Sequence, residues 1–125
     1  EVLKRVKKGS DKAIQVLAGQ KIKRAGMELS EYFMPGLGGK TLSRVNALET
    51  ADALNQINPD FIRLRTLALP ESTPLAQQHR SGEFDKMVDV ETAEELLLFL
   101  ENLNCIDSSL QSRPYIDGLI IRCVR

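Results

Sequence analysis

A glycine-rich turn is the first part of the sequence whose residue types could serve chemistry. It occupies residues 34–40, with the sequence MPGLGGK, and begins at the last of the largely apolar residues 29–34. A buried strand that runs through such a turn into a helix places the turn at the carboxyl edge of an α/β sheet, where ligands bind. Gly36, Gly38 and Gly39 can adopt positive φ and let a ligand approach the backbone without a Cβ in between. A tight strand-to-helix turn that binds no ligand would explain the same glycines.

Two arginines are the second candidate for chemistry. Arg63 and Arg65 alternate with Ile62 and Leu64 in an apolar segment. If the aliphatic residues pack against helices, alternation along a strand points both guanidinium groups to the other side, toward the lumen of a barrel. Guanidinium groups buried there need carboxylates, phosphates or a ligand as partners. Two readings stay open, namely contact with a ligand and internal salt bridges to Glu31.

The remaining reactive side chains do not assemble into a recognisable site. Cys105 and Cys123 lie in no CxxC pair and near no histidine, which indicates neither a metal site nor a disulfide framework. His79 stands in a polar segment without a companion and is expected to be solvated. Tyr32 is expected to pack within its strand, although its hydroxyl could reach a ligand in the lumen. We therefore assign no catalytic residue.

Three amphipathic helices are expected to position these residues. The first is predicted over residues 11–25, with Ser10 or Asp11 as its N-cap and Gly26 as its stop. Its spacing of three and four predicts a buried face made of Ile14, Leu17, Ala18, Ile22 and Ala25.

The second helix is predicted over residues 43–57, with Thr41 or Ser43 as its cap and the sequence NPD at 58–60 as its end. Its buried stripe is predicted to be Leu48, Ala51, Leu54 and Ile57. The third is predicted to start after Asp89, which can cap it, with Glu91 and Glu94 placed to favour the helix dipole. Its apolar face is predicted to be Ala93, Leu96, Leu97, Leu100 and Leu103.

Two strands are predicted between these helices, over residues 27–34 and 61–67. Residues 70–84 are predicted to form a long polar loop, of a length typical of lids and binding loops. Residues 115–124 have the apolar content of a further strand, without an evident pairing partner.

The order of these elements is a βα repeat, which predicts an α/β fold with parallel strands and right-handed crossovers. Two strands do not make a stable sheet. We therefore expect part of a barrel or open sheet whose other strands lie outside this chain. The strand over residues 27–34 would then have an open outer edge, which predicts a homodimer. Folding of the segment 115–124 over that edge is the alternative.

Composition limits the class of protein. The chain has 125 residues, is 42% hydrophobic, and holds 17 basic and 17 acidic residues, which suits one domain with a core. Basic residues gather in 4–24 and acidic residues in 83–101, as on solvated helix faces. No aromatic residue interrupts the basic run for stacking on bases, so nucleic acid is not an expected partner.

With neither a membrane-spanning run nor a targeting segment, we expect a cytoplasmic protein. The first residue is not methionine, which suggests a piece of a longer protein.

Several stretches together resemble radical S-adenosylmethionine (radical SAM) proteins. They are MPGLGG at 34–39, ALETA at 47–51 and NPDFIRLRTL at 58–67, accompanied by VLK at 2–4, KG at 8–9, TPL at 73–75 and GEF at 82–84. The most similar group is related to oxygen-independent coproporphyrinogen oxidase and is described as iron–sulfur oxidoreductases. The resemblance covers residues 2–104 in matching order and spacing, which leaves residues 105–125 as a divergent tail.

The resemblance implies a partial (βα)6 barrel similar to a TIM barrel, of which this chain would hold strands five and six with their helices. It implies that Met34, Gly36, Gly38 and Gly39 lie near the adenine of S-adenosylmethionine, and that Arg63, Arg65 and Thr66 belong to the same pocket wall. The family cleaves S-adenosylmethionine to a 5′-deoxyadenosyl radical on a [4Fe–4S] cluster held by a CxxxCxxC motif. This sequence lacks that motif, so the cluster ligands would lie in the remainder of the barrel and the isolated chain is expected to be inactive.

Three hypotheses follow from the sequence. The first is a fragment of a radical SAM oxidoreductase whose substrate the sequence does not identify. The second is a non-catalytic nucleotide- or phosphate-binding α/β module, in which the glycines at 36–39 and the helix start after Thr41 hold an anion. The third is a βα segment with a purely structural role.

Overall fold

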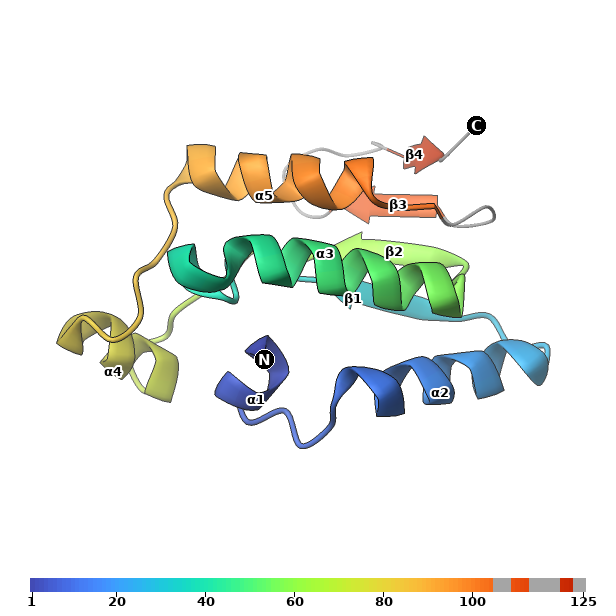
Figure 1. The fold of residues 1–125 in the computed structure, drawn as a ribbon, viewed down its shortest axis with the longest axis horizontal. Helices are drawn as coiled ribbons and strands as arrows, with labels where there is room; N and C mark the ends of the chain where they lie inside the picture. Colours follow the sequence, from blue (N-terminus) through green and yellow to red (C-terminus); the bar gives the residue numbers. More distant parts are fainter. Residues whose placement is uncertain (105–108, 113–119, 123–125) are drawn as a thin grey trace.

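Helices and strands alternate along most of the chain, in a mixed α/β arrangement (Figure 1). The computed structural model describes residues 1–104, 109–112 and 120–122. In chain order the elements are α1 (Val2–Arg5), α2 (Lys12–Arg24), β1 (Ser30–Phe33), α3 (Gly39–Ile57), β2 (Phe61–Leu64), α4 (Pro74–Ser81), α5 (Asp89–Glu101), β3 (Ser109–Ser112) and β4 (Ile120–Arg122).

The strands form one sheet in the order β1-β2-β3-β4. The pair β1–β2 is parallel, as the βα repeat predicts. Strand β3 was not predicted: it extends the sheet parallel to β2, and β4 is antiparallel to β3. The expectation that the other strands of the sheet lie outside this chain is therefore wrong for these two. Figure 1 shows α3 and α5 lying in front of the sheet, α2 beyond the β1 edge and α4 at one end. The register of the first pair sets Tyr32 beside Arg63, and Glu31 beside Ile62.

Both central strands are shorter than the sequence predicts. The predicted strand at 27–34 begins only at Ser30, because the Leu29 N–H donates to Asp60 Oδ2 at 2.8 Å instead of to a neighbouring strand. The predicted strand at 61–67 ends at Leu64, although the Arg65 N–H still donates to the Phe33 carbonyl at 2.9 Å.

Only part of the predicted strand at 115–124 lies within the described residues. That part, Ile120–Arg122, pairs with β3 at the far side of the sheet from β1. It therefore does not cover the outer edge of β1, which corrects the alternative that the tail folds over that edge. Residues 115–119, 123 and 124 lie outside the described ranges.

Helix α2 has the predicted ends but a different buried face. Asp11 is its N-cap and accepts a hydrogen bond from the Ile14 N–H at 2.9 Å. The predicted face is wrong, since Ile14 and Leu17 are exposed by 56% and 49%. Val16 and Gly19 are buried instead, because the helix approaches α3 so closely that a Cβ on Gly19 would lie 2.7 Å from the Cγ2 atom of Ile57. This contact fixes the rotation of α2.

Helix α3 begins four residues earlier than predicted, so Thr41 and Ser43 lie inside it and the prediction that they cap it is wrong. Backbone carbonyls accept hydrogen bonds from its first N–H groups: the Gly39 N–H donates to the Gly36 carbonyl at 2.9 Å, and the Lys40 N–H donates to the Asp85 carbonyl at 3.0 Å. The predicted stripe is confirmed for Ala51, Leu54 and Ile57, which are buried, while Leu48 is half-buried. The predicted end is confirmed at Asn58, which adopts a left-handed conformation.

The predicted loop at 70–84 contains a helix, α4. Its Thr73 side chain accepts a hydrogen bond from the Ala76 N–H at 3.3 Å, and Pro74 occupies the first helical position. Gly82 ends it with φ of 81°. These are ordinary helix start and stop residues, and the polar composition of the segment obscured them.

Helix α5 also differs in its cap and face. Asp89 is its first helical residue rather than its cap, and Glu91 Oε2 accepts from the Val88 N–H at 2.8 Å. Of the predicted face, Leu97 is exposed by 56% and Ala93 is exposed, whereas Leu103 is buried. Phe99, which the prediction left out, is fully buried. The Phe99 ring stacks on Phe33 with a centroid distance of 4.1 Å, which orients the helix.

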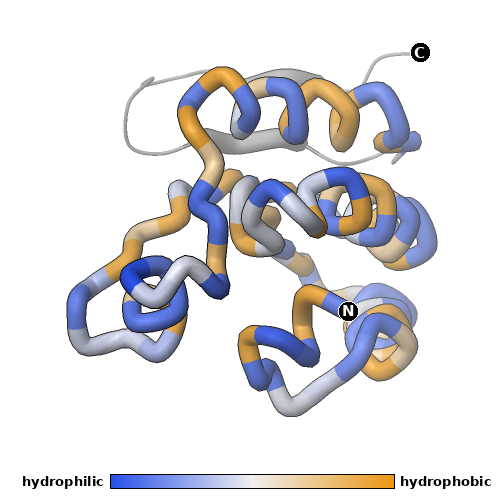
Figure 2. The backbone as a smooth tube through the Cα atoms, turned by 60° about the vertical axis from the view of Figure 1, so that its left-hand side comes forward, coloured by the Kyte–Doolittle hydropathy of each residue, from blue (hydrophilic) through white to orange (hydrophobic). Residues whose placement is uncertain are grey.

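The main core lies between the sheet and the helices in front of it, and hydrophobic and hydrophilic residues alternate along α3 and α5 accordingly (Figure 2). Its buried members are Phe33, Ala47, Ala51, Leu54, Ile62, Phe99 and Leu103. No helix in the described part of the chain is both long enough and apolar enough to cross a lipid bilayer.

Candidate functional site

The glycine-rich turn follows β1 and leads directly into α3. Gly36 has φ of 81°, a conformation that costs residues with a Cβ, and Gly39 has φ of 63°. The Leu37 N–H lies 3.4 Å from the Met34 carbonyl, and Arg5 of α1 reaches the Gly38 carbonyl at 3.4 Å.

A buried carboxylate holds this turn in place. Glu95, on α5, is only 2% exposed. Its Oε1 atom accepts hydrogen bonds from the Gly36 N–H at 3.2 Å and from Asn46 Nδ2 at 2.7 Å. Its Oε2 atom accepts from Ser43 Oγ at 2.7 Å, and Asn46 Nδ2 also lies 3.2 Å from the Met34 carbonyl. The carboxylate therefore connects α5, α3 and the turn.

Neutral hydrogen-bond donors take the place of a cationic partner for the Glu95 carboxylate. None of the ion pairs among the described residues includes Glu95. A buried carboxylate without a cation requires hydrogen bonds to offset its lost hydration, and neutral donors from α3 and the turn supply them. The consequence is a turn whose backbone is fixed from within the core.

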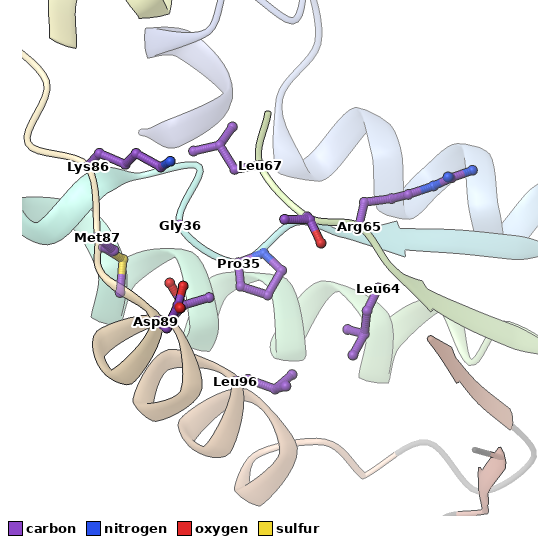
Figure 3. A pocket seen from close by; sticks show the side chains of 11 residues that line it. Pro35, Gly36, Leu64, Arg65, Leu67, Lys86, Met87, Asp89 and Leu96 are labelled. Atoms are coloured by element: carbon purple, nitrogen blue, oxygen red, sulfur yellow. The ribbon is translucent and has the colours of Figure 1, made fainter. Parts of the chain in front are cut away.

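A cleft of about 260 Å³ opens beside Gly36, at the carboxyl ends of β1 and β2 (Figure 3). One wall comes from the turn, a second from the segment after β2 and a third from the segment that leads into α5. The lining residues are Pro35, Gly36, Leu64, Arg65, Thr66, Leu67, Lys86, Met87, Asp89, Thr92 and Leu96.

The structure brings together three of the predicted site residues, Gly36, Arg65 and Thr66, at this cleft. The described lining does not include Met34, Gly38, Gly39 or Arg63. The second and third glycines serve packing: a Cβ on Gly38 would lie 2.9 Å from Leu42 Cβ, and one on Gly39 would lie 2.8 Å from the Asp85 carbonyl oxygen. Met34 is half-buried.

The two arginines lie on the face of the sheet opposite Ile62. Ile62 is fully buried beneath the helices, whereas Arg63 and Arg65 are exposed. Although Arg65 lines the cleft, its side chain extends away from Lys86 and Asp89 (Figure 3). Its guanidinium carbon lies 4.9 Å from the centre of the Tyr32 ring.

Salt bridges to Glu31, one of the two readings of the arginines, are not formed. Glu31 shares the face of Ile62, its register partner, and no described ion pair joins it to Arg63 or Arg65. Burial raises the pKa of its carboxyl group, and the nearby Lys8 opposes that effect in part.

Sequence reasoning missed Glu95 and Asn46, and it identified Ser43 only as a helix cap. The signal for Glu95 was the aromatic residue Phe99, four positions later. Residues four apart share a helix face, so orienting α5 on its largest apolar side chain would have turned Glu95 inward.

No protein-family model matches the chain, and no curated protein matches its sequence. Within the described residues, no three side chains of histidine, cysteine, aspartate or glutamate are grouped as a metal site would need.

Proposed function

We propose that this chain is the C-terminal half of the barrel of a radical SAM iron–sulfur oxidoreductase and supplies a wall of the pocket for the adenosyl group. The observation that carries the proposal is the cleft at the carboxyl ends of two parallel strands, with Gly36 fixed in its wall by Glu95. In parallel α/β sheets, ligands bind at this edge. The motif similarity across residues 2–104 is the second support.

The cleft suits part of a nucleoside. Its volume of about 260 Å³ is below the ~300–1,000 Å³ typical of complete ligand pockets, so it would take a portion such as adenine. Leu64, Leu67 and Leu96 offer apolar contact, and Thr66 offers a hydroxyl group. The lack of a Cβ at Gly36 lets a planar base approach the backbone.

S-adenosylmethionine, when bound together with a [4Fe–4S] cluster, supplies the radical chemistry of such an enzyme. In this proposal the cluster ligands belong to the remainder of the barrel, and this chain binds and orients the adenosyl group. Its fixed turn keeps the wall in one conformation, since Glu95, Ser43 and Asn46 hold it from the side away from the ligand. The substrate would bind in the lumen of the same barrel.

The alternative is a non-catalytic module that holds a nucleotide or phosphate at the start of α3. One observation weighs against it. The first N–H groups of α3, those of Gly39 and Lys40, already donate to the carbonyls of Gly36 and Asp85, so an anion would have to compete with these bonds.

Calorimetric titration of the chain with S-adenosylmethionine and with inorganic phosphate tests the proposal. We expect heat of binding with S-adenosylmethionine. The affinity should be lower in Thr66→Val, because this substitution removes the hydroxyl group in the cleft with little change of shape. The matched control is Thr41→Val, at an exposed threonine of α3, which should bind S-adenosylmethionine with the wild-type affinity. Binding of phosphate alone would favour the non-catalytic module, and binding of neither would leave a structural segment.

The full-length gene product provides a second, independent test. We expect a CxxxCxxC motif in the sequence that precedes Glu1 there. A preceding sequence without any cysteine triad would overturn the assignment to radical SAM chemistry.

A further inference from the structure

Tyr32, Arg63 and Arg65 form a cluster, here called the Tyr–Arg cluster, on the exposed face of the sheet. Tyr32 and Arg63 are register partners in the parallel pair β1–β2, so their side chains emerge side by side. Arg65 follows two residues after Arg63 and emerges on the same face, because the Arg65 N–H still bonds to Phe33 and continues the strand pattern. Tyr32 is 49% exposed and both arginines are exposed.

The three side chains act on one another. The Arg65 guanidinium stacks over the Tyr32 ring, 4.9 Å from its centre. Hydrogen bonding by Arg65, and secondarily by Arg63, lowers the pKa of the Tyr32 hydroxyl group. Stacking also restricts the Arg65 side chain, which reduces the entropy lost when the guanidinium binds a ligand.

The two positive charges have no acidic partner among the described residues. All ion pairs in the described part of the chain are formed by lysines, namely Lys12, Lys23 and Lys40. Asp60, the acidic residue nearest to the arginines in the sequence, pairs with Lys23, and Glu31 lies on the opposite face with Ile62. Two guanidinium groups, which can only donate, and a phenol hydroxyl, which can donate and accept, therefore present positive charge and hydrogen-bond donors over this face.

We propose that the Tyr–Arg cluster is a binding site for an oxyanion, the carboxylate or phosphate group of a ligand that lies over the exposed face of the sheet. Guanidinium groups bind planar or tetrahedral oxyanions through paired N–H donors, and these charge-assisted bonds are among the strongest in proteins. The Tyr32 hydroxyl group can donate a further bond. The site adjoins the cleft beside Gly36 and shares Arg65 with it, but the Arg65 side chain extends away from Lys86 and Asp89 (Figure 3).

Tyr32 itself reports on binding. The chain has two tyrosines and no tryptophan, so Tyr115→Phe leaves Tyr32 as the single tyrosine chromophore. Ionisation of Tyr32 is followed by ultraviolet difference absorbance in this background. We expect inorganic phosphate, succinate or both to raise the pKa of Tyr32, since a bound oxyanion offsets the guanidinium charges that lower it. Sodium chloride at matched ionic strength should produce a clearly smaller shift.

The arginine variants show whether the effect is local. Arg65→Gln should weaken the response to the oxyanion by about tenfold or more, as expected for the loss of a charge-assisted hydrogen bond. Arg24→Gln removes an exposed arginine at the end of α2 and should leave the affinity unchanged. Arg63→Gln provides a second variant if Arg65→Gln does not fold, as judged by circular dichroism.

Each outcome bears on the proposal. A response to phosphate alone or to succinate alone supports the site and identifies the group it prefers. An equal response to chloride, or the wild-type affinity in both arginine variants, would overturn it. The result does not depend on radical SAM chemistry: failure to bind S-adenosylmethionine would remove the proposed function and leave the oxyanion site standing.

Discussion

Glu95 illustrates how much one side chain can determine in this molecule. Its two carboxylate oxygens accept from Gly36 in the turn and from Ser43 and Asn46 on α3. Without that acceptor, the buried Gly36 N–H would lose its hydrogen bond, and Asn46 Nδ2 would keep only its contact with the Met34 carbonyl. The shape of the candidate site thus depends on a residue that does not line it.

We predict that Glu95→Gln lowers the free energy of unfolding by about 1–3 kcal/mol, the cost of a buried donor left without an acceptor. The amide would turn an NH₂ group toward a donor where the carboxylate has an acceptor. Urea denaturation measures the change. Glu94→Gln, at the neighbouring exposed position, is the control and should behave as wild type. Equal effects of the two substitutions would show that the network contributes nothing to stability.

Glu31 predicts a pH dependence of the opposite kind to that of a stabilising carboxylate. Burial raises the pKa of Glu31 above its unfolded value of about 4.3, so ionisation of this carboxyl group opposes folding. The stability that the protonated group contributes below the unfolded pKa is lost as pH rises through the folded-state pKa. We expect Glu31→Gln to be more stable than wild type at pH 7, with the gain disappearing below the unfolded pKa. Denaturation curves at several pH values would reveal this. A gain that does not vary with pH would contradict the explanation, as would the same gain in the exposed Glu28→Gln.

At the scale of elements, the sequence predicted which segments are helical more reliably than how each helix is turned. Capping residues such as Asp11 and Asn58 act locally, so they could be read from their neighbours. The rotation of a helix depends on its partner across the interface. Gly19 against Ile57 and Phe99 on Phe33 orient α2 and α5, and both contacts join residues far apart in the sequence.

The glycines of the turn give a prediction at this scale. Gly39→Ala combines a left-handed backbone with a Cβ 2.8 Å from the Asp85 carbonyl oxygen and 2.9 Å from the Phe84 ring, so we expect it to destabilise the fold strongly. Gly82→Ala has a similar φ but no atom within 4 Å of the new Cβ, so it should cost only the backbone strain of about 1–3 kcal/mol. Thermal or urea unfolding of the two variants separates these causes, and equal losses would argue against the packing role of Gly39.

At the scale of the whole molecule, the cleft joins three segments, around Gly36, around Thr66 and between Lys86 and Leu96. The first two follow predicted strands, and sequence analysis could place them at one edge of the sheet. The third depends on the path through α4, a segment predicted to be a loop. Its contributions from Lys86, Met87 and Asp89 could therefore not be predicted.

In the proposed function the cluster ligands belong to the remainder of the barrel, so we predict that this chain binds no iron on its own. The sequence has two cysteines, Cys105 and Cys123, and no CxxxCxxC motif. Anaerobic reconstitution with iron and sulfide, followed by iron analysis and absorption spectroscopy, is the measurement. An iron-to-protein ratio near one or above, with an absorption band of a cluster, would contradict the prediction.

The open edge of the sheet leads to a prediction about self-association. Strand β1 is at one end of the sheet order, and the main-chain groups of Leu29 and Phe33 bond toward β2, so those of Ser30 and Tyr32 point outward by strand alternation. Beyond this edge, α2 exposes Ile14 and Leu17. An edge strand flanked by apolar side chains is a template for pairing with another chain.

We therefore expect the chain to form a homodimer through β1. Sedimentation velocity across the micromolar range should show a dimer that dissociates on dilution. Ser30→Pro removes an outward N–H group from the edge and should shift the equilibrium to monomer, with the circular dichroism of the fold preserved. A wild-type chain that stays monomeric throughout this range would rule out the pairing, and a dimer unaffected by Ser30→Pro would place the interface elsewhere.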